Sequence, residues 1–511
     1  MSNQNLFAAL RAAFPADLDA TAIETADSTT PQFYTWRDLE RGTAMLANLI
    51  AGLALPEGSR IAVQTEKSVE ALMLYLAVLR AGHVYLPLNT AYQAGEITYF
   101  IGNAEPAMVV CADKNFGWVS KIAFLAGTRH VFTLNEDRTG TLLDRAAFQG
   151  DQHQPALRRA GDLAAILYTS GTTGRSKGAM LTHGNLLSNA QVLHKAWGWR
   201  PDDVLVHALP IFHVHGLFVA SHGALLAGAK MVWFGRFDPR AVAARLPQAS
   251  VFMGVPTLYV RLLGETALTK AACAHMRLFV SGSAPLLIET FKLWQERTGH
   301  TILERYGMSE TVMLTSNPYQ PATARRGGTV GPPLPGVGVR VQSDKAVPLA
   351  AGEIGNIEVK GPNVFKGYWR MPEKTADEFT TDSWFKTGDV GKVDTDGFVT
   401  IVGRSKDLII SGGYNVYPAE IEGCINELPG VAESAVVGVP HKDFGEAVLA
   451  LVVAKPGSML DGAAVVAALK SQIANFKVPK QVFVVDELPR NAMGKVQKNL
   501  LRDQHQGLFA R

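Results

Sequence analysis

Cysteine is scarce in this chain. Its 511 residues include only three, Cys111, Cys273 and Cys424, and these lie far apart. Such spacing supports neither a disulfide framework nor the closely spaced thiols of a zinc site. Scattered free thiols are typical of proteins in a reducing compartment, so we expect a cytoplasmic protein.

Long apolar runs are also lacking. The sequence contains no uninterrupted apolar stretch of about 18 residues, the length that a transmembrane helix requires. Near the N-terminus, Leu6, Phe7, Leu10 and Phe14 recur at helical spacing. This segment predicts an amphipathic surface helix rather than the long apolar core of a signal peptide. We therefore expect no membrane partner.

Neither sign of charge is in excess. The 49 Lys and Arg residues nearly balance the 46 Asp and Glu residues, which leaves a net charge of +3, and no block of like charges stands out. Nucleic-acid-binding proteins usually carry a basic patch, so we expect no nucleic-acid partner. The hydrophobic fraction of 47% and the charged fraction of 19% are ordinary for a globular protein. At about 150 residues per domain, the length allows roughly three folding units.

The order of apolar segments predicts an α/β fold. Between residues 60 and 310, short apolar segments of β type alternate with helical patterns. Glycine, proline and turn dipeptides dominate from 326 to 403, and strand and helix patterns resume afterwards. We predict a large N-terminal domain of stacked α/β sheets over 1–403, with a β-rich subdomain over 326–403. A small α+β C-terminal domain is expected over 404–511.

The strongest local motif lies between residues 168 and 180. It reads YTSGTTGRSKGAM and follows an apolar segment, 163–167. Glycines let backbone N–H groups converge on an anion, and the hydroxyl groups and Lys177 add further donors for phosphate oxygens. The motif differs from a Walker A loop, since Arg, Ser and Lys follow Gly174. The segment therefore predicts a phosphate-binding loop of another kind, with a flexible surface loop as the alternative.

This motif resembles the phosphate-loop signature of the acyl-adenylate-forming superfamily, which includes acyl-CoA synthetases, peptide-synthetase adenylation domains and luciferases. Four more segments resemble that superfamily's motifs and follow in the same order. They are YGMSE at 306–310, WFKTGD at 384–389, GRSKD at 403–407 and PRNAMGK at 489–495. Ser309 stands where the superfamily usually has threonine. The resemblance covers nearly the whole chain, which is identified as a member because five motifs occur in the superfamily's order.

The resemblance implies a reaction in two steps. A carboxylate attacks the α-phosphorus of ATP to give an acyl-adenylate and pyrophosphate, and a thiol, usually coenzyme A, then displaces AMP. It also implies that the C-terminal domain is a mobile lid that rotates between the steps, with its hinge at Lys406. Gly412 and Gly413 of the lid are expected near the thiol channel. ATP, Mg²⁺ and coenzyme A are the implied cofactors and co-substrate.

The resemblance assigns roles to single residues, each of which could alone be an ordinary surface or turn residue. Lys495 is expected to be catalytic, because a flexible ammonium can bridge the carboxylate and the α-phosphate. Glu310 is expected to bind Mg²⁺, which prefers hard oxygen ligands. Asp389 should accept hydrogen bonds from the ribose hydroxyls, and Arg404 should donate to ribose or phosphate. The other expected nucleotide-binding residues are Thr169, Ser170, Gly171, Thr172, Thr173, Gly174, Lys177, Tyr306 and Ser309. Acetylation would remove the charge of Lys495, so a lysine acetyltransferase and deacetylase are hypothetical partners.

Charged and polar residues in the expected acyl pocket predict the acid. Arg305 stands where the fatty- and aryl-acid branches usually have a small residue, and Arg261 lies on an expected helix beside the pocket. Ser283 adds a hydroxyl group, and His213 lies in the superfamily's acyl-pocket segment, where it is also a catalytic candidate. Two desolvated arginines are costly unless a second anion neutralises them, which favours a dicarboxylate.

The segments ERYGMSE, VPTLYVRLL and SGSAPL also resemble the malonyl-CoA synthetase branch. The expected substrate is therefore malonate or a small 2-substituted malonate such as methylmalonate. The alternative is that the two arginines pair locally with Glu304 or Glu265, as surface ion pairs often do.

Other functions remain open at this point. The nearest is an acid–thiol ligase for another short-chain or aryl carboxylic acid. Peptide-synthetase adenylation domains usually carry an aspartate for the substrate amine in the pocket segment, and 212–215 contains none. A luciferase-type oxidation is compatible with the motifs, but a charged pocket suits it poorly. A catalytically inactive nucleotide-binding regulator is disfavoured, because the charged residues expected in catalysis are all present.

Overall fold

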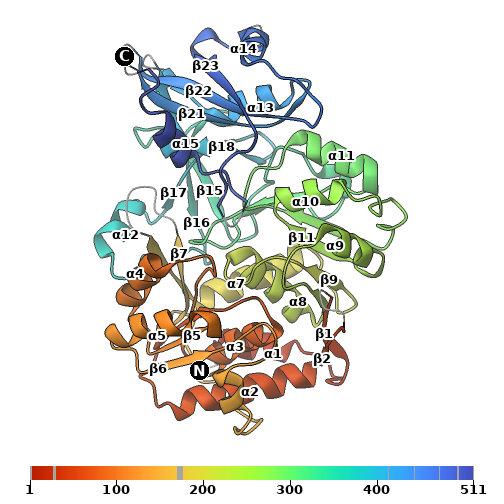
Figure 1. Ribbon diagram of the computed structural model, residues 1–511, viewed down its shortest axis with the longest axis vertical. Helices are drawn as coiled ribbons and strands as arrows, with labels where there is room; N and C mark the ends of the chain where they lie inside the picture. Colours follow the sequence, from red (N-terminus) through yellow and green to blue (C-terminus); the bar gives the residue numbers. More distant parts are fainter. Residues whose placement is uncertain are drawn as a thin grey trace.

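The computed structural model describes residues 3–26, 30–169, 176–411, 414–441, 444–470, 472–491 and 494–509. Over this part of the chain the strands form four sheets, and helices cover the sheets of the N-terminal part (Figure 1). The prediction of a mixed α/β fold, with a large N-terminal part and a small C-terminal one, is confirmed.

The first sheet of the N-terminal part has six strands and is mostly parallel. Its strand order is β6 (His130–Thr133), β5 (Met108–Cys111), β3 (Arg60–Gln64), β4 (Val84–Pro87), β7 (Leu163–Thr169) and β8 (Lys177–Thr182). Only β7 and β8 are antiparallel neighbours. The associated helices are α2 (Trp36–Gly52), α3 (Val69–Arg80), α4 (Ala94–Ala104), α5 (Phe116–Leu125) and α6 (Thr141–Ala146). All residues of β4 and β5 are buried, as expected for parallel strands that are covered on both faces.

The second sheet has eight strands and a parallel centre. Its order is β14 (Thr315–Ser316), β13 (Leu303–Tyr306), β12 (Leu278–Ser281), β11 (Val251–Gly254), β9 (Val204–His207), β10 (Lys230–Trp233), β1 (Thr21–Thr25) and β2 (Phe33–Thr35). Its helices are α7 (His183–Ala196), α8 (His222–Ala227), α9 (Pro239–Arg245), α10 (Pro256–Leu263) and α11 (Ile288–Thr298). The predicted N-terminal helix is present as α1 (Leu6–Ala12), whose Leu6, Phe7 and Leu10 are buried.

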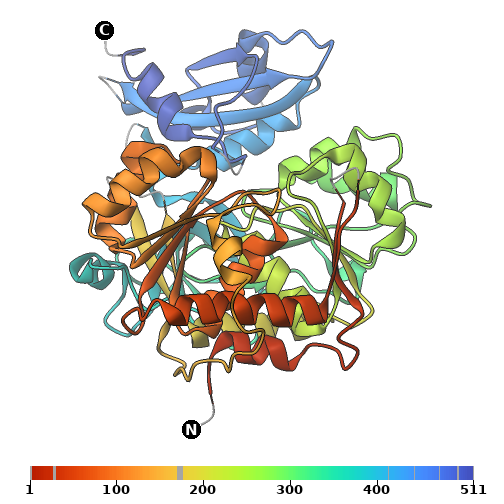
Figure 2. The same cartoon turned by 60° about the horizontal axis from the view of Figure 1, so that its bottom comes forward.

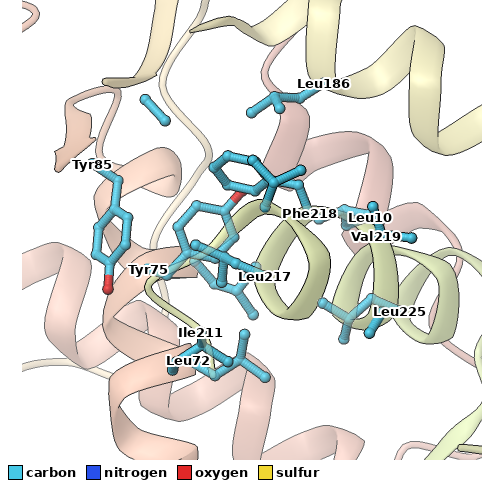
Figure 3. Close-up of a cluster of buried hydrophobic side chains, with 14 of the residues drawn as sticks. Leu10, Leu72, Tyr75, Tyr85, Leu186, Ile211, Leu217, Phe218, Val219 and Leu225 are labelled. Atoms are coloured by element: carbon cyan, nitrogen blue, oxygen red, sulfur yellow. The ribbon is translucent and has the colours of Figure 1, made fainter. Parts of the chain in front are cut away.

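The two sheets share one apolar core. Figure 3 shows Leu72 and Tyr75 of α3 pointing toward Leu217 and Phe218 of η2 (His215–Ser221), a π-helical turn that precedes α8. The Tyr75 hydroxyl lies 2.8 Å from Nε2 of His222, so the polar groups at this junction are paired with each other. Helix α3 is buried along its whole length because it lies between the two sheets.

The predicted β-rich segment is a four-stranded antiparallel sheet. Its order is β15 (Gly338–Gln342), β16 (Gly355–Lys360), β17 (Phe385–Val393) and β18 (Val399–Arg404). One helix that the sequence analysis did not predict, α12 (Pro372–Glu378), lies between β16 and β17. A single turn, η5 (Ser405–Asp407), then leads from β18 to the C-terminal part.

The C-terminal part has its own sheet and its own small cores. Its strands are β19 (Ile409–Ser411), β20 (Tyr414–Val416), β21 (Val431–His441), β22 (Gly445–Ala454) and β23 (Gln481–Val485). Its helices are α13 (Pro418–Asn426), α14 (Gly462–Lys470) and α15 (Lys498–His505). Figure 2 shows this part, in blue, as a separate layer over the N-terminal sheets. In the described part of the chain, none of the helices has the length and apolarity needed to cross a membrane.

Candidate active site

The predicted site residues gather beyond the carboxyl ends of the parallel strands β9, β11, β12 and β13. Ligand sites of open α/β sheets usually form at such ends. Strand β13 leads into Tyr306 and the turn that follows it, and the β17–β18 hairpin brings Asp389 and Arg404 to the same place. The site is therefore assembled from two sheets that are distant in sequence.

Tyr306, Asp389 and Arg404 form one hydrogen-bonded cluster. The Tyr306 hydroxyl donates to Oδ2 of Asp389, and Nε of Arg404 lies 2.8 Å from Oδ1 of the same carboxylate. Burial by itself would lower the pKa of Arg404, but the electrostatic effects of Asp389, Tyr306, Glu310 and Asp407 together outweigh it, so this pKa is raised. The cluster thus offers a fixed acceptor beside a permanent cation, which suits a ribose and its phosphate.

Glu310 is a buried carboxylate in the turn after β13, next to the half-buried Ser309. Its Oε1 accepts a hydrogen bond of 3.0 Å from the Tyr368 hydroxyl. Burial raises the pKa of Glu310, while the Tyr368 hydrogen bond and the charges of Arg404 and Lys177 act in the opposite direction. No cluster of three or more His, Cys, Asp or Glu side chains suited to a metal occurs among the described residues. A Mg²⁺ ion at Glu310 would take its other ligands from phosphate oxygens and water, as is usual for this ion.

Thr169 and Lys177 flank the phosphate loop. They are paired in register at the open end of the β7–β8 hairpin. Nζ of Lys177 lies 3.3 Å from Oε1 of Glu378 and 4.3 Å from the ring centroid of Tyr368. The predicted contacts Ser170, Gly171, Thr172, Thr173 and Gly174 lie outside the described residues, as do Gly412 and Gly413.

A tight turn of the C-terminal part presents Lys495. The Lys495 N–H donates to Oδ1 of Asn491 at 3.0 Å, and the Asn491 N–H donates to the Lys495 carbonyl at 2.9 Å. The side chain is accessible to solvent, yet the surrounding protein and the charge of Arg404 lower its pKa to about 8. Asp389 acts in the opposite direction. Lys495 therefore faces the cluster that contains Asp389 and Arg404.

Arg305 is a buried cation that forms no ion pair with any acid in the described part of the chain. It is 3% exposed, and its Nε and Nη2 have no hydrogen-bond partner among the described residues. The guanidinium packs against Gly282, where an added Cβ would lie 2.5 Å from Cζ, so the position leaves no room for a side chain. Burial lowers the pKa of Arg305 to about 9, which leaves it charged at pH 7. The alternative of an Arg305–Glu304 pair is not found among the described residues: Nε and Nη2 of Arg305 have no partner there, and Glu304 accepts a hydrogen bond of 3.0 Å from the Gly328 N–H.

Burial and the positive charges of Arg305 and Lys495 all act on the pKa of His213. Burial, followed by these two positive charges, lowers its pKa to about 4. Burial and Arg305 likewise hold the pKa of His215 well below its usual range. The Ser283 hydroxyl lies 3.5 Å from Nδ1 of His215, on a residue whose φ of 72° places it in the left-handed region. Two neutral imidazoles therefore lie near Arg305, and the Ser283 hydroxyl lies beside one of them.

Arg261 lies apart from Arg305. It is exposed on α10, with its guanidinium 5.0 Å from the ring centroid of Phe237. It lines a cavity of about 570 Å³, whose lining does not include Arg305. The expectation that both arginines share one pocket is thus not met in this arrangement. The reason is helical geometry: Tyr259 faces inward and donates to the Val280 carbonyl, and a residue two positions later lies on the other side of the helix. Among the described residues, Arg261 and Glu265 form no ion pair either.

The cavity beside Arg261 lies where the N-terminal and C-terminal parts meet. Its lining includes Phe212 from the acyl-pocket segment and Arg490, Asn491 and Gly494 from the turn that carries Lys495. A Cβ at Gly494 would lie 3.1 Å from Oγ1 of Thr257 on α10, so the two parts touch there. The turn that carries Lys495 therefore lies against α10 in this structure.

Comparison with known proteins agrees with these features. The AMP-binding enzyme family matches residues 11–369, and the AMP-binding enzyme C-terminal domain matches residues 420–495. The chain belongs to the AMP-binding enzyme family. The predicted membership of the acyl-adenylate-forming superfamily is thereby confirmed.

Three relatives of this AMP-binding enzyme are informative. The ATP-bound crystal structure of MatB from Rhodopseudomonas palustris matches with a TM-score of 0.96 and 53% identity, covering 99% of this chain and 100% of that one. A malonate–CoA ligase of Arabidopsis thaliana is 35% identical over 88% of this chain and 79% of its own length. A feruloyl-CoA synthase of Amycolatopsis sp. is also 35% identical, over 92% of this chain and 93% of its own. Because the last two differ in their acid at equal identity, the substrate of the AMP-binding enzyme must be argued from its site.

Lys406 lies in η5, between the sheet of the N-terminal part and β19. Its side chain is exposed, and the neighbouring Asp407 forms an ion pair of 2.7 Å with Arg502 of α15. The connection is a single short turn at the end of a strand, as expected of residues that absorb a backbone rotation.

The sequence analysis missed two residues of the site. Tyr368 contacts both Glu310 and Lys177, and Glu378 pairs with Lys177. Neither residue lies in one of the five motifs. Tyr368 reaches the site because the backbone of residues 365–369 is hydrogen-bonded to Glu310 and to β8.

Proposed function

We propose that this AMP-binding enzyme is an ATP-dependent malonate–CoA ligase. It adenylates one carboxylate of malonate, with release of pyrophosphate, and then transfers the malonyl group to coenzyme A, with release of AMP. Methylmalonate, which differs by one methyl group, is the expected second substrate. The similarity to a malonate–CoA ligase supports the substrate class.

The observation that carries the choice of acid is the buried charge of Arg305. A desolvated guanidinium with unpaired N–H groups is costly, and a bound carboxylate would remove that cost. Burial and the charges of both Arg305 and Lys495 act on the pKa of His213, and we propose that the two cations border one binding space. Malonate has one carboxylate for each. Arg261 lines the adjacent cavity on the other side of α10, so the proposed contact to the distal carboxylate is assigned to Arg305.

The nucleotide is proposed to lie along the hydrogen-bonded cluster and the β7–β8 hairpin. Asp389 accepts from the ribose hydroxyls, Arg404 donates to ribose or α-phosphate, and Lys177 binds the outer phosphates. The backbone amides and hydroxyls of residues 169–174 are proposed to complete the phosphate site. Glu310 would hold Mg²⁺, which neutralises the phosphate charge when it is bound.

In the first step, one carboxylate oxygen of malonate attacks the α-phosphorus, and the bond to the bridging oxygen of pyrophosphate breaks. Negative charge accumulates on the α-phosphate oxygens as this happens. Lys495 is proposed to place its ammonium between these oxygens and the attacking carboxylate, which favours the transition state over the ground state. His213, neutral at pH 7, is proposed to orient the carboxylate without adding charge.

In the second step, the thiolate sulfur of coenzyme A attacks the acyl carbon, and the acyl–phosphate bond breaks to release AMP. Lys495 occupies the site in the present arrangement, so we propose that the C-terminal part, from residue 404 on, rotates about Lys406 before this step. The proposal divides the chain at the turn between β18 and β19.

A panel of acids tests the proposal. The full chain is incubated with ATP, Mg²⁺, coenzyme A and malonate, methylmalonate, succinate, acetate, propionate or benzoate, and pyrophosphate release is measured. Malonate should give the highest kcat/KM. Activity with acetate or benzoate that equals malonate would instead identify a ligase for short-chain or aryl acids.

A further inference from the structure

We propose that Tyr368 is a positioning residue that couples the metal-binding carboxylate to the phosphate-binding lysine. Its hydroxyl donates to Oε1 of Glu310 at 3.0 Å, while its ring face lies 4.3 Å from Nζ of Lys177. A single side chain therefore contacts both groups that would handle the phosphates and their metal. The inference rests on the proposed function, which gives Glu310 and Lys177 those roles.

The backbone fixes Tyr368 from two sides. On one side, the Phe365 N–H donates to the carbonyl of Glu310 at 2.8 Å. On the other, Tyr368 bridges to Ala179 of β8, and the Trp369 N–H donates to the Gly178 carbonyl at 2.7 Å. Because the segment is held against both Glu310 and β8, the ring has a defined place between them.

The burial of Tyr368 makes both contacts effective. The side chain is 3% exposed and packs edge-on against Phe365, with ring centroids 4.8 Å apart. A hydroxyl donor aimed at a buried carboxylate orients that carboxylate and leaves its other oxygen for a metal. The ring face attracts the ammonium of Lys177, which Glu378 holds from another direction at 3.3 Å.

The two contacts can be separated by substitution. Tyr368→Phe keeps the ring beside Lys177 and removes the hydrogen bond to Glu310. Tyr368→Leu removes both. ATP binding to the full-length protein is measured by calorimetry in excess Mg²⁺ and again in EDTA, so that the gain in affinity from the metal is obtained without any turnover.

In Tyr368→Phe the gain in affinity from Mg²⁺ should fall by about tenfold, as expected for a hydrogen bond to a charged group, with metal-free ATP binding unchanged. In Tyr368→Leu metal-free binding should also weaken, by about fivefold, because the cation–π contact is lost. The matched control is Tyr75→Phe, which removes a buried hydroxyl 2.8 Å from His222 in the core and should leave both affinities unchanged.

A double-mutant comparison decides whether the hydroxyl acts through Glu310. In a Glu310→Gln background, Tyr368→Phe should have no further effect on the Mg²⁺ dependence. The proposal is overturned if Tyr368→Phe binds metal-bound and metal-free ATP as the unsubstituted protein does, or if the effects of the two substitutions add. If Glu310→Gln alone leaves the Mg²⁺ dependence intact, the role of Glu310 in the proposed function fails instead, and the two failures are thus distinguishable.

Discussion

Replacing Arg305 tests the assignment of the acid most directly. The side chain is buried against Gly282 and has two N–H groups without partners among the described residues. Arg305→Ala removes the charge, and Arg305→Met removes it while filling most of the volume. Arg305→Lys keeps a charge but cannot form two parallel hydrogen bonds to one carboxylate.

The structure sets the expected magnitude. A hydrogen bond to a charged group contributes about 1.5–3 kcal/mol, so two of them to the distal carboxylate give about 3–6 kcal/mol. At about 1.4 kcal/mol per factor of ten, this is roughly 10²–10⁴ in kcat/KM for malonate. Acetate makes neither contact, so its kcat/KM should start several orders of magnitude lower and should change little in Arg305→Ala. Succinate should also react poorly, because its second carboxylate lies one carbon too far.

The assay is steady-state pyrophosphate release with malonate and acetate for each variant. The ratio of the two kcat/KM values should fall toward one in Arg305→Ala and Arg305→Met, and Arg305→Lys should recover little of it. The reasoning is refuted if acetate matches malonate in the unsubstituted protein, or if Arg305→Ala leaves the ratio unchanged.

A stability measurement separates binding from packing. The depressed pKa of Arg305 means that the folded state disfavours its charge, and the penalty is fully present at any pH below about 9. Arg305→Met should therefore raise the Tm of the ligand-free protein while it abolishes the further rise that malonate gives the unsubstituted protein. A lower Tm for Arg305→Met would show that the guanidinium has a structural role.

Four further predictions concern the C-terminal part. Lys495→Ala should abolish adenylate formation, measured as pyrophosphate release, but should largely spare thioester formation from supplied malonyl-AMP; equal loss of both steps would contradict the role given to Lys495. Because the Lys495 pKa is about 8, the ammonium is lost as pH rises through that value, so kcat/KM for adenylation should fall above pH 8, and a flat profile to pH 9.5 would count against it. Acetylation of Lys495, quantified by mass spectrometry, should inactivate the enzyme in proportion to its extent, and full activity of a fully acetylated sample would exclude this regulation. Lys406→Pro should block the backbone rotation and so stop coenzyme A transfer while adenylation continues; undiminished overall turnover would place the hinge elsewhere.

Much of the fold was predictable because buried parallel strands have a simple pattern. Segments such as 84–87 and 108–111 are apolar at nearly every position, as expected of strands that are covered on both faces. Helix α12 was missed because its first turn begins with proline and none of its residues is buried, so it has no apolar periodicity to detect.

The site, like the fold, could be predicted only in part from the sequence. The ordered motifs predicted a set of nucleotide-binding residues, since each motif is a local run of residues, and two of these residues, Asp389 and Arg404, meet across one hairpin. The coupling of Glu310 to Lys177 through Tyr368 was not predictable, because it depends on a backbone segment that lies against two strands distant in sequence.

The sequence by itself thus determined the family, the alternation of strands and helices and the residue types expected in the site, because these depend on local patterns. The tertiary structure decided which charged side chains lie together. Arg305 is buried against Gly282, and its Nε and Nη2 have no partner among the described residues, whereas Arg261 lies on the other side of α10. A sequence records that two arginines are present, but the cost of an unpaired charge depends on its burial, and burial is set only when the sheets and helices pack together.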